Sequence, residues 1–329
     1  MSLTAKESIV AAIKDEAPQE PGVYLFRDES GEVIYVGKSV NLRHRMLSYF
    51  QTDPSRMDGR TRELVFRIRD CSFELTETEL LALLLEDSLI KKHMPAYNVR
   101  QKEFEQYRYL KVTADAFPTC VVLKQPEITE NPRVFGPFRD QYFVDDVLKV
   151  LHQCFNLRAC TEPMPMNVCL SYDIGQCIGP CRGDVSHAEY ASIVNHVLDF
   201  LDGNESEAVS RLTQKMDEHA GKLEFEKAAE IKQQLDFCKR LCARHRFIRE
   251  FRECSLVLLH RADQAYVYTF ARGRLCGHRK VSRDTDLSKL SVCSDNSAPA
   301  EDGRFVFDRA NIVYNWLSND RNECEWQVS

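Results

Sequence analysis

Residues 22–36 of the chain read GVYLFRDESGEVIYV, and the fold predicted for the N-terminal part is built on this segment. Two apolar runs, residues 23–26 and 33–36, flank the polar segment DESG. Apolar runs of this length around a short Asp- and Gly-containing segment predict a β-hairpin. Pairing of the two strands would let Tyr24 and Tyr35 present both hydroxyl groups to one site.

Two helices are expected after the hairpin. Residues 76–79 form a capping-box pattern before a strongly apolar helix at residues 80–93, which Pro95 ends. Together with the hairpin, the helices predict an α+β domain over residues 15–100. The other helix, residues 41–50, has one face made of Leu42, Arg45, Met46 and Tyr49.

Composition sets bounds on the class of protein. The chain has 329 residues and a net charge of −6, but residues 36–70 carry eight Lys or Arg against four Asp or Glu. This local excess fits a nucleic-acid site on an otherwise acidic protein, and it fits an ordinary solvated helix equally well. No run of about 18 apolar residues occurs, and residues 1–13 lack a signal-peptide core. We therefore expect a cytoplasmic protein with no membrane partner.

The remainder of the chain changes character several times. Strands are predicted at residues 109–112 and 120–123, followed by a turn at 136–138 and a helix at 144–152. Charged helices follow from residue 188 to 244, broken near 203–204 and at Gly221, and the tail has short strands, a polar loop at 291–303 and a helix at 311–317. The expected domains are 15–100, a β/α connector with a cysteine segment at 101–190, a helical region at 191–245 and a β-rich tail of unassigned role at 246–329.

The residues around Tyr35 suit phosphodiester chemistry. A tyrosine on a strand usually packs in the core or at its rim, so the two tyrosines alone predict little. Here Gly37 permits close approach of the backbone, and Lys38 follows it. Lys38 is expected to lower the pKa of a neighbouring phenol so that it can accept a proton. Arg45, one turn before Tyr49, is expected to stabilise charge on phosphoryl oxygens.

Glu86 is unusual because leucine surrounds it in its helix. An unpaired carboxylate in apolar surroundings is costly, so we expect this one to be paired or bound to a cation. Two interpretations stay open. Glu86 is either a charge at the rim of the core, or an oxygen ligand for Mg²⁺, which accepts a single protein carboxylate with water and phosphate completing its octahedron.

Four cysteines gather in the middle of the chain. Cys160, Cys169, Cys177 and Cys181 are separated by eight, seven and three residues. Disulfides are rare in cytosolic proteins, and four thiolates are the donor set of an iron–sulfur cluster or a structural zinc site. Spacing alone does not choose iron over zinc, and four scattered buried thiols remain the alternative.

Residues 211–242 predict a helical hairpin. Two helices bury too little surface to be stable alone, so the hairpin should pack inside this protein or against a partner. Its first helix carries the apolar stripe Leu212, Met216, Ala220 and Leu223, and its second carries Ala228, Ile231, Leu235, Cys238 and Cys242.

The ordered set of N-terminal motifs resembles the GIY-YIG nuclease domain of the UvrC/Cho excinuclease family. The resemblance rests on GVY at 22–24, YVG at 35–37, NLR at 41–43, LSYF at 47–50, LLEDSLIKK at 84–92 and PAYN at 95–98. The site residues that it implies are Tyr35 as the base or water-activating group, Lys38 beside it, Tyr24, Arg45 and Tyr49 around the scissile phosphate, Glu86 as the ligand of Mg²⁺ or Mn²⁺, and Asn98 as a supporting residue.

Two later segments resemble the same family. The pattern around Cys169, Cys177 and Cys181 is similar to the family's cysteine motif, which implies a [4Fe–4S] cluster rather than zinc. The gap between Cys160 and Cys169 is shorter than usual in the family, so Cys154 is an alternative first ligand. Residues 223–230, LEFEKAAE, resemble the UVR motif, which implies a UvrB-like helicase subunit as partner, with the aromatic Phe225 as an anchor.

The resemblance implies a DNA repair endonuclease that acts on damaged double-stranded DNA. It would make a single metal-dependent incision, 3′ to a lesion, in nucleotide excision repair with UvrB. We find no acidic triad and no Gly-rich hairpin pair after residue 245, so the family's RNase H-like nuclease and helix-hairpin-helix regions are expected to be absent. Two alternatives are a non-catalytic repair adaptor and a GIY-YIG nuclease acting on other DNA structures.

Overall fold

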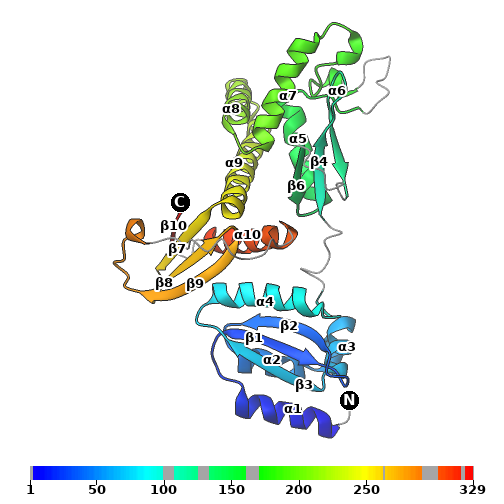
Figure 1. The fold of residues 1–329 in the computed structure, drawn as a ribbon. Coiled ribbons are helices and arrows are strands. Elements are labelled where there is room, and N and C mark those ends of the chain that lie inside the picture. Colours follow the sequence, from blue (N-terminus) through cyan, green and yellow to red (C-terminus); the bar gives the residue numbers. More distant parts are fainter. Residues whose placement is uncertain are drawn as a thin grey trace. The chain divides into compact units, whose positions relative to one another are not determined.

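The computed structural model describes residues 3–98, 107–124, 133–160, 170–261, 264–290, 303–319 and 323–328 (Figure 1). The chain divides into two compact units, which are described separately. The first comprises Met1–Phe104, His260–Ala265 and Ala300–Cys324, and the second comprises Glu105–Leu259, Tyr266–Pro299 and Glu325–Ser329.

A three-stranded antiparallel sheet organises the first unit. Its strands are β1 (Gly22–Arg27), β2 (Val33–Ser39) and β3 (Asp70–Leu75), in the order β2-β1-β3. The hairpin predicted from residues 22–36 is confirmed, and its register pairs Tyr24 with Gly37 and Phe26 with Tyr35.

Helices cover both faces of this sheet (Figure 1). Alternate residues of β1 point to opposite faces, so Val23 and Leu25 pack against α4 (Glu79–His93). Tyr24 and Phe26 pack on the other side, where the apolar cluster draws on α1 (Leu3–Glu16), α2 (Leu42–Gln51) and α3 (Gly59–Arg67). A one-turn 3-10 helix, Pro54–Arg56, lies between α2 and α3.

The predicted apolar helix is confirmed and begins one residue earlier than expected, but the predicted capping box at residues 76–79 is wrong. Thr78, not Thr76, is the N-cap of α4, and its hydroxyl accepts a hydrogen bond from the Leu81 N–H at 3.3 Å. The Thr76 N–H instead donates to the Pro21 carbonyl at 3.1 Å, which holds Thr76 at the end of the sheet. The other predicted helix is confirmed, with Asn41 as its N-cap.

The second unit begins with a sheet of order β5-β4-β6, made of β4 (Arg108–Val112), β5 (Cys120–Leu123) and β6 (Val134–Phe138). The two predicted strands are confirmed, but the turn predicted at residues 136–138 is wrong because these residues lie in β6. An edge strand tolerates proline, and an irregular register between β4 and β6 accommodates the Gly-Pro pair.

Helices form the rest of this core. They are α5 (Gln141–Phe155), α7 (His187–Leu201), α8 (Ser206–Gly221) and α9 (Phe225–Glu253), and short turns occur at α6 (Leu170–Asp173) and Pro180–Arg182. The predicted breaks near residues 203–204 and at Gly221 are confirmed. Buried side chains from α5, α7, α8 and α9 share one apolar cluster with β4 and β6.

The tail is rich in strands, as expected. The strands β7 (Ser255–Arg261), β8 (Ala265–Ala271), β9 (Arg274–Val281) and β10 (Cys324–Val328) form a sheet of order β10-β7-β8-β9, with a short turn at Leu287–Lys289. The final helix α10 (Gly303–Leu317) starts earlier than the predicted residue 311. It belongs to the first unit, where it packs against α4.

Most of the loop predicted at 291–303 lies outside the described residues. In the described part of the chain, none of the helices has the length and apolar character needed to cross a membrane.

Candidate active site

Three tyrosines from different elements form a triangle on the α2 side of the N-terminal sheet. Tyr24 comes from β1, Tyr35 from β2 and Tyr49 from α2, and their ring centroids are 6.0 to 6.1 Å apart. The hydroxyl oxygens of Tyr24 and Tyr49 lie 2.9 Å from each other, within hydrogen-bond distance. Tyr24 and Tyr49 are buried, whereas Tyr35 is partly exposed.

Gly37 leaves the space that this arrangement needs. A Cβ atom at Gly37 would lie 2.5 Å from the Tyr24 hydroxyl oxygen and 3.0 Å from the Tyr35 ring. Both rings are confined by packing, so a side chain here would displace the triangle. The hairpin register explains the closeness because Tyr24 is the cross-strand partner of Gly37.

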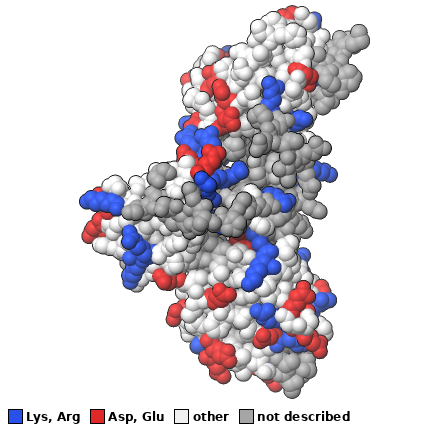
Figure 2. Space-filling view, viewed as in Figure 1, with Lys and Arg blue, Asp and Glu red and all other residues white. Residues whose placement is uncertain are grey.

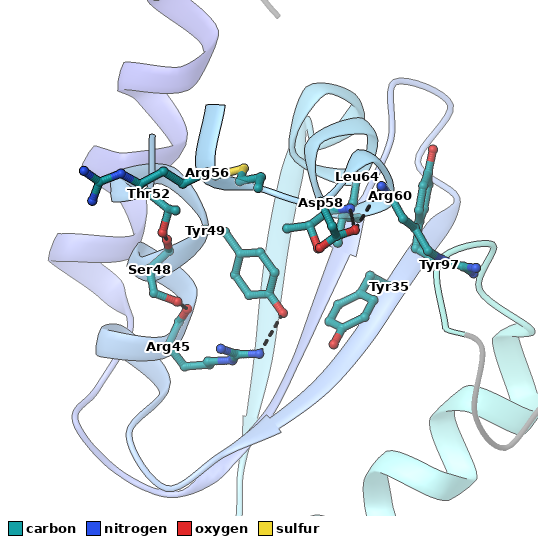
Figure 3. Close-up of a pocket in the computed structure, with 12 residues that line it drawn as sticks. Tyr35, Arg45, Ser48, Tyr49, Thr52, Arg56, Asp58, Arg60, Leu64 and Tyr97 are labelled. Carbon is teal, nitrogen blue, oxygen red and sulfur yellow. Dashed lines mark hydrogen bonds between the residues drawn. The ribbon is translucent and has the colours of Figure 1, made fainter. Parts of the chain in front are cut away.

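Arg45 is fixed to the triangle through Tyr49, one helical turn away. One guanidinium nitrogen donates to the Tyr49 hydroxyl oxygen at 3.3 Å, and the guanidinium carbon lies 5.0 Å from the ring centroid (Figure 3). Pairs at this spacing meet on a helix surface. Arg45 is otherwise exposed, so its positive charge is open to a ligand.

Tyr24 and Tyr35 hold their protons more tightly than a free phenol. Burial raises the pKa of Tyr35 well above its usual value, and the nearby Arg45 lowers it only in part. Burial also raises the pKa of Tyr24. The expectation that Lys38 lowers a phenol pKa is wrong, because the Lys38 ammonium group pairs with Glu79 at 2.8 Å on the α4 side.

Glu86 lies close to the strand that carries Tyr35. Its Oε1 atom accepts a hydrogen bond from the Lys38 backbone N–H at 2.9 Å, which ties α4 to β2. Burial raises the carboxyl pKa, and this hydrogen bond lowers it in part. The side chain is half-buried, and among the described residues Oε1 carries its one hydrogen bond. The second oxygen is therefore available to a cation.

Asn98 supports the same strand. Its side-chain oxygen accepts from the Val36 N–H at 2.9 Å, and its side-chain nitrogen donates to the Val36 carbonyl at 2.8 Å. The preceding Tyr97 N–H bonds the Ile34 carbonyl at 3.0 Å. These bonds flank Tyr35 on both sides and fix the backbone that carries it.

A cleft of about 370 Å³ opens beside the triangle (Figure 3). Of the predicted site residues, Tyr35, Arg45 and Tyr49 line it, whereas Tyr24, Lys38, Glu86 and Asn98 do not. Other lining residues were missed by sequence reasoning and include Arg56, Asp58, Arg60, Thr61 and Tyr97. Asp58 caps α3 by accepting from the N–H groups of Arg60 and Thr61, and the pattern DGRT at residues 58–61 is the signal that could have located this helix start.

Three arginines against one acid line the cleft, which makes it electropositive. Arg60 also donates to the Ala96 carbonyl at 3.1 Å, which fixes its position near Tyr97. On the face of the molecule that Figure 2 shows, acidic and basic side chains are interspersed.

The described cysteines do not assemble a metal site by themselves. Cys177 is buried and its sulfur accepts from the Gly179 N–H at 3.3 Å, while Cys181 lies in the next turn. Cys169 lies outside the described residues, and within the described ranges no three potential ligands are grouped to hold a metal ion. Cys154, the alternative ligand, is buried beside Cys238 in the helical core.

The hairpin of α8 and α9 has a buried base and an exposed tip. Leu212, Leu235, Cys238 and Cys242 are buried in the core of the second unit. At the tip, Leu223 and Phe225 keep 73% and 65% of their surface exposed. The predicted stripes therefore serve packing inside this protein at the base and leave the tip open.

Comparisons with known proteins match the chain in three consecutive segments. The model of the UvrC-like GIY-YIG domain matches residues 20–99, that of the UvrC/Cho excinuclease middle domain matches residues 107–200, and that of the UvrB/uvrC motif matches residues 206–240. The chain belongs to the UvrC-like excinuclease family. The GIY-YIG and UVR resemblances are thereby confirmed.

Individual relatives support the family assignment. The UvrABC system protein C of Acetivibrio thermocellus is 32% identical over 326 residues, which cover 92% of this chain and 52% of the relative. The protein of the same name from Caldicellulosiruptor saccharolyticus is 39% identical over 236 residues, 70% of this chain and 39% of the relative. The chain thus spans about half the length of these curated UvrC relatives or less.

Solved structures match the N-terminal region. The GIY-YIG N-terminal endonuclease domain of UvrC from Thermotoga maritima, bound to magnesium as its catalytic divalent cation, is 31% identical. The match covers 30% of this chain and 100% of that chain, with a TM-score of 0.25.

Proposed function

We propose that this chain is a metal-dependent DNA endonuclease that hydrolyses one phosphodiester at the tyrosine triangle. The observation that carries the proposal is the convergence of Tyr35, Tyr49 and Arg45 on an electropositive cleft, with the Glu86 carboxylate tied to the same strand. Cationic and hydroxyl side chains are groups that commonly bind phosphate oxygens in proteins. The similar GIY-YIG domain of UvrC from Thermotoga maritima binds magnesium as its catalytic divalent cation, which supports metal dependence here.

Arg45 binds the scissile phosphate in this proposal and stabilises the charge that develops on its oxygens. Tyr49 orients Arg45, and Tyr24 orients Tyr49 through the hydroxyl pair. These contacts exist before DNA binds, so the site is preorganised.

Tyr35 lines the cleft as a neutral phenol at pH 7, since a free phenol has a pKa of about 10 and burial raises that pKa further. It can donate a hydrogen bond to a water or a phosphoryl oxygen without any change of charge. It acts as the base only if it first loses its own proton. Lys38 contributes through its backbone N–H, which orients Glu86, while its ammonium group pairs with Glu79.

Glu86 is the proposed ligand of Mg²⁺ or Mn²⁺. A half-buried carboxylate with one hydrogen-bonded oxygen fits the single-carboxylate coordination that Mg²⁺ accepts. When bound, such a cation supplies Lewis-acid stabilisation of phosphoryl charge and lowers the pKa of bound water.

The incision is proposed to lie 3′ to a lesion in double-stranded DNA, with a UvrB-like subunit marking the site. The open tip of the α8–α9 hairpin, with Phe225 exposed, supports docking of that partner. Phe225→Ala should weaken pull-down of the partner, and Tyr142→Ala, which removes another exposed aromatic ring in the same unit, should not.

A [4Fe–4S] cluster on Cys160, Cys169, Cys177 and Cys181 is also proposed, and the sequence pattern alone supports it. The cluster takes no part in the proposed incision reaction. Iron content and visible absorbance of protein purified without oxygen test the assignment. Cys177→Ser should abolish both signals while Cys276→Ser, at an exposed position, leaves them intact. Stoichiometric zinc without iron would overturn the proposal.

The proposed function is tested by incubating the protein with a lesion-containing duplex and Mg²⁺, with and without UvrB, and mapping the position of any cut. One cut on the 3′ side of the lesion, dependent on Mg²⁺, is expected from the wild-type chain. Binding of UvrB and DNA without cutting would instead indicate a repair adaptor. Equal cutting of branched DNA without a lesion would indicate a nuclease of another pathway.

A further inference from the structure

Helix α10 contributes one carboxylate to a buried ion cluster in the first unit. The Lys91 ammonium nitrogen lies 2.7 Å from the Asp87 carboxylate on its own helix α4 and 2.9 Å from the Asp308 carboxylate on α10. It also lies 5.0 Å from the centre of the Phe305 ring. We call Asp87, Lys91 and Asp308 the α4–α10 cluster.

The burial of the α4–α10 cluster separates it from ordinary surface ion pairs. The side chains of Asp87, Lys91 and Asp308 keep only 2%, 9% and 13% of their surface exposed. Buried ion pairs give little net stability compared with apolar packing, but removing one partner leaves an uncompensated charge and is strongly destabilising. Lys91 contacts one carboxylate on each helix, so the cluster ties α10 to α4.

The fixed helix is the one that carries Glu86. Asp87 is the next residue, and Lys91 lies one turn further along the helix. The opposite face of α4 packs on the sheet through Ala82, Leu89 and Ile90, and Glu86 reaches the Lys38 N–H of β2. The sheet therefore holds α4 from one side and α10 holds it from the other.

We propose that Asp308 is a positioning residue for the nuclease site. Through Lys91 it orders α4 and so fixes the Glu86 carboxylate, which makes α10 a working part of the nuclease unit. Residues 303–317 lie beyond all three segments that match the family models, so no comparison assigns them this role. The part that concerns the cation rests on the proposed function.

Hydrogen–deuterium exchange of the full chain tests the structural part without any need for activity. Asp308→Ala should speed exchange of the α4 amides, residues 82–93, while β1 amides keep their wild-type rate. Asn315→Ala, which shortens an exposed polar side chain on the same helix, is the matched control and should change neither. Asp308→Asn, which keeps the size of the side chain, serves if Asp308→Ala does not fold.

Incision over a Mg²⁺ titration tests the functional part. Loss of a group that orients a metal ligand usually weakens metal affinity, so Asp308→Asn should raise the Mg²⁺ concentration for half-maximal rate about 10-fold. The rate at saturating Mg²⁺ should stay near that of the wild type. Unchanged α4 exchange in both Asp308 variants would overturn the proposal, and so would faster exchange with an unchanged Mg²⁺ requirement. If the wild-type chain cuts nothing, the proposed function fails, while the exchange result still decides whether α10 orders α4.

Discussion

The hydroxyl oxygens of Tyr24 and Tyr49 lie 2.9 Å apart, although one residue is on strand β1 and the other on helix α2. Arg45 donates to the same oxygen of Tyr49 at 3.3 Å. A core tyrosine, a second buried tyrosine and an exposed arginine are thus linked in one chain of hydrogen bonds. The Arg45 guanidinium, which faces the cleft, is therefore held in place by buried tyrosines of the core.

Tyr49→Phe removes the hydroxyl group that links Tyr24 to Arg45 in this hydrogen-bond network. The buried Tyr24 hydroxyl loses its hydrogen bond to Tyr49, so the free energy of unfolding should fall by about 1 to 3 kcal/mol. Arg45 loses its anchor, and incision should slow by about 100-fold or more, as when one donor to a transition-state oxyanion is removed. Urea unfolding and single-turnover incision measure the two effects. Wild-type values for both would show that the hydrogen-bonded chain has no role.

Gly37→Ala should disable the site by steric displacement. The new methyl group would lie 2.5 Å from the Tyr24 hydroxyl oxygen, which packing holds in place. We expect loss of incision together with a lower unfolding midpoint. Gly59→Ala is the matched control, because a Cβ there meets nothing within 4 Å, and its rate should equal that of the wild type.

Asn98→Ala removes both hydrogen bonds to Val36 and frees the strand that presents Tyr35. The maximal incision rate should fall while the Mg²⁺ requirement stays constant, since Glu86 is tied to Lys38 and not to Asn98. A Mg²⁺ titration of the incision rate separates the two quantities. A large rise in the Mg²⁺ requirement at an unchanged maximal rate would assign Asn98 to the metal instead.

The local pattern of the sequence predicted the hairpin, α2 and most of α4, because apolar spacing and turn residues act over short distances. It also predicted that Tyr24 and Tyr35 approach one site, since both lie on one hairpin, and their ring centroids are 6.1 Å apart. The cleft residues Arg56, Arg60 and Tyr97 were missed, because their approach to Tyr35 depends on how α3 and the segment after α4 pack on the sheet.

Lys38 shows a second limit of the sequence. Its position after Gly37 suggested an effect on the phenol pKa, but the side chain reaches Glu79 across the sheet edge. Burial instead raises the pKa of Tyr35, and burial follows from tertiary packing. The contact between Lys91 and Asp308 joins parts of the chain far apart in sequence, so no local pattern could reveal it.

The second unit should lose stability in mild acid through His245. Burial lowers its pKa to about 4 from a usual value near 6.5, and the imidazole stacks on Phe138. The folded state therefore binds this proton less readily than the unfolded state. The stabilising contribution is complete above about pH 6.5 and is lost as pH falls toward 4.

At pH 5 the loss should be about 1 to 2 kcal/mol relative to pH 7, allowing for partial exposure of the ring. Urea unfolding of the wild type and of His245→Gln at both pH values measures it. The variant should show a smaller pH dependence by that amount. Equal pH dependence of the two proteins would assign the acid sensitivity to other groups.

Glu86 holds the cation of the proposed metal-dependent nuclease centre, and the variant Glu86→Gln is the sharpest test of this role. The amide can still accept from the Lys38 N–H, so the fold should persist, but the charge is lost. Glu79→Gln is the matched control on the same helix, because Glu79 pairs with Lys38 at an exposed position. The measurement is the single-turnover incision rate of a lesion-containing duplex over a Mg²⁺ titration, with DNA affinity measured in parallel. Glu86→Gln should cut at least about 100-fold more slowly than the wild type at every Mg²⁺ concentration, with unchanged DNA affinity. Glu79→Gln should stay within about 2-fold of the wild type. Incision by Glu86→Gln at the wild-type rate, or a loss of DNA affinity in place of incision, would contradict this role of Glu86.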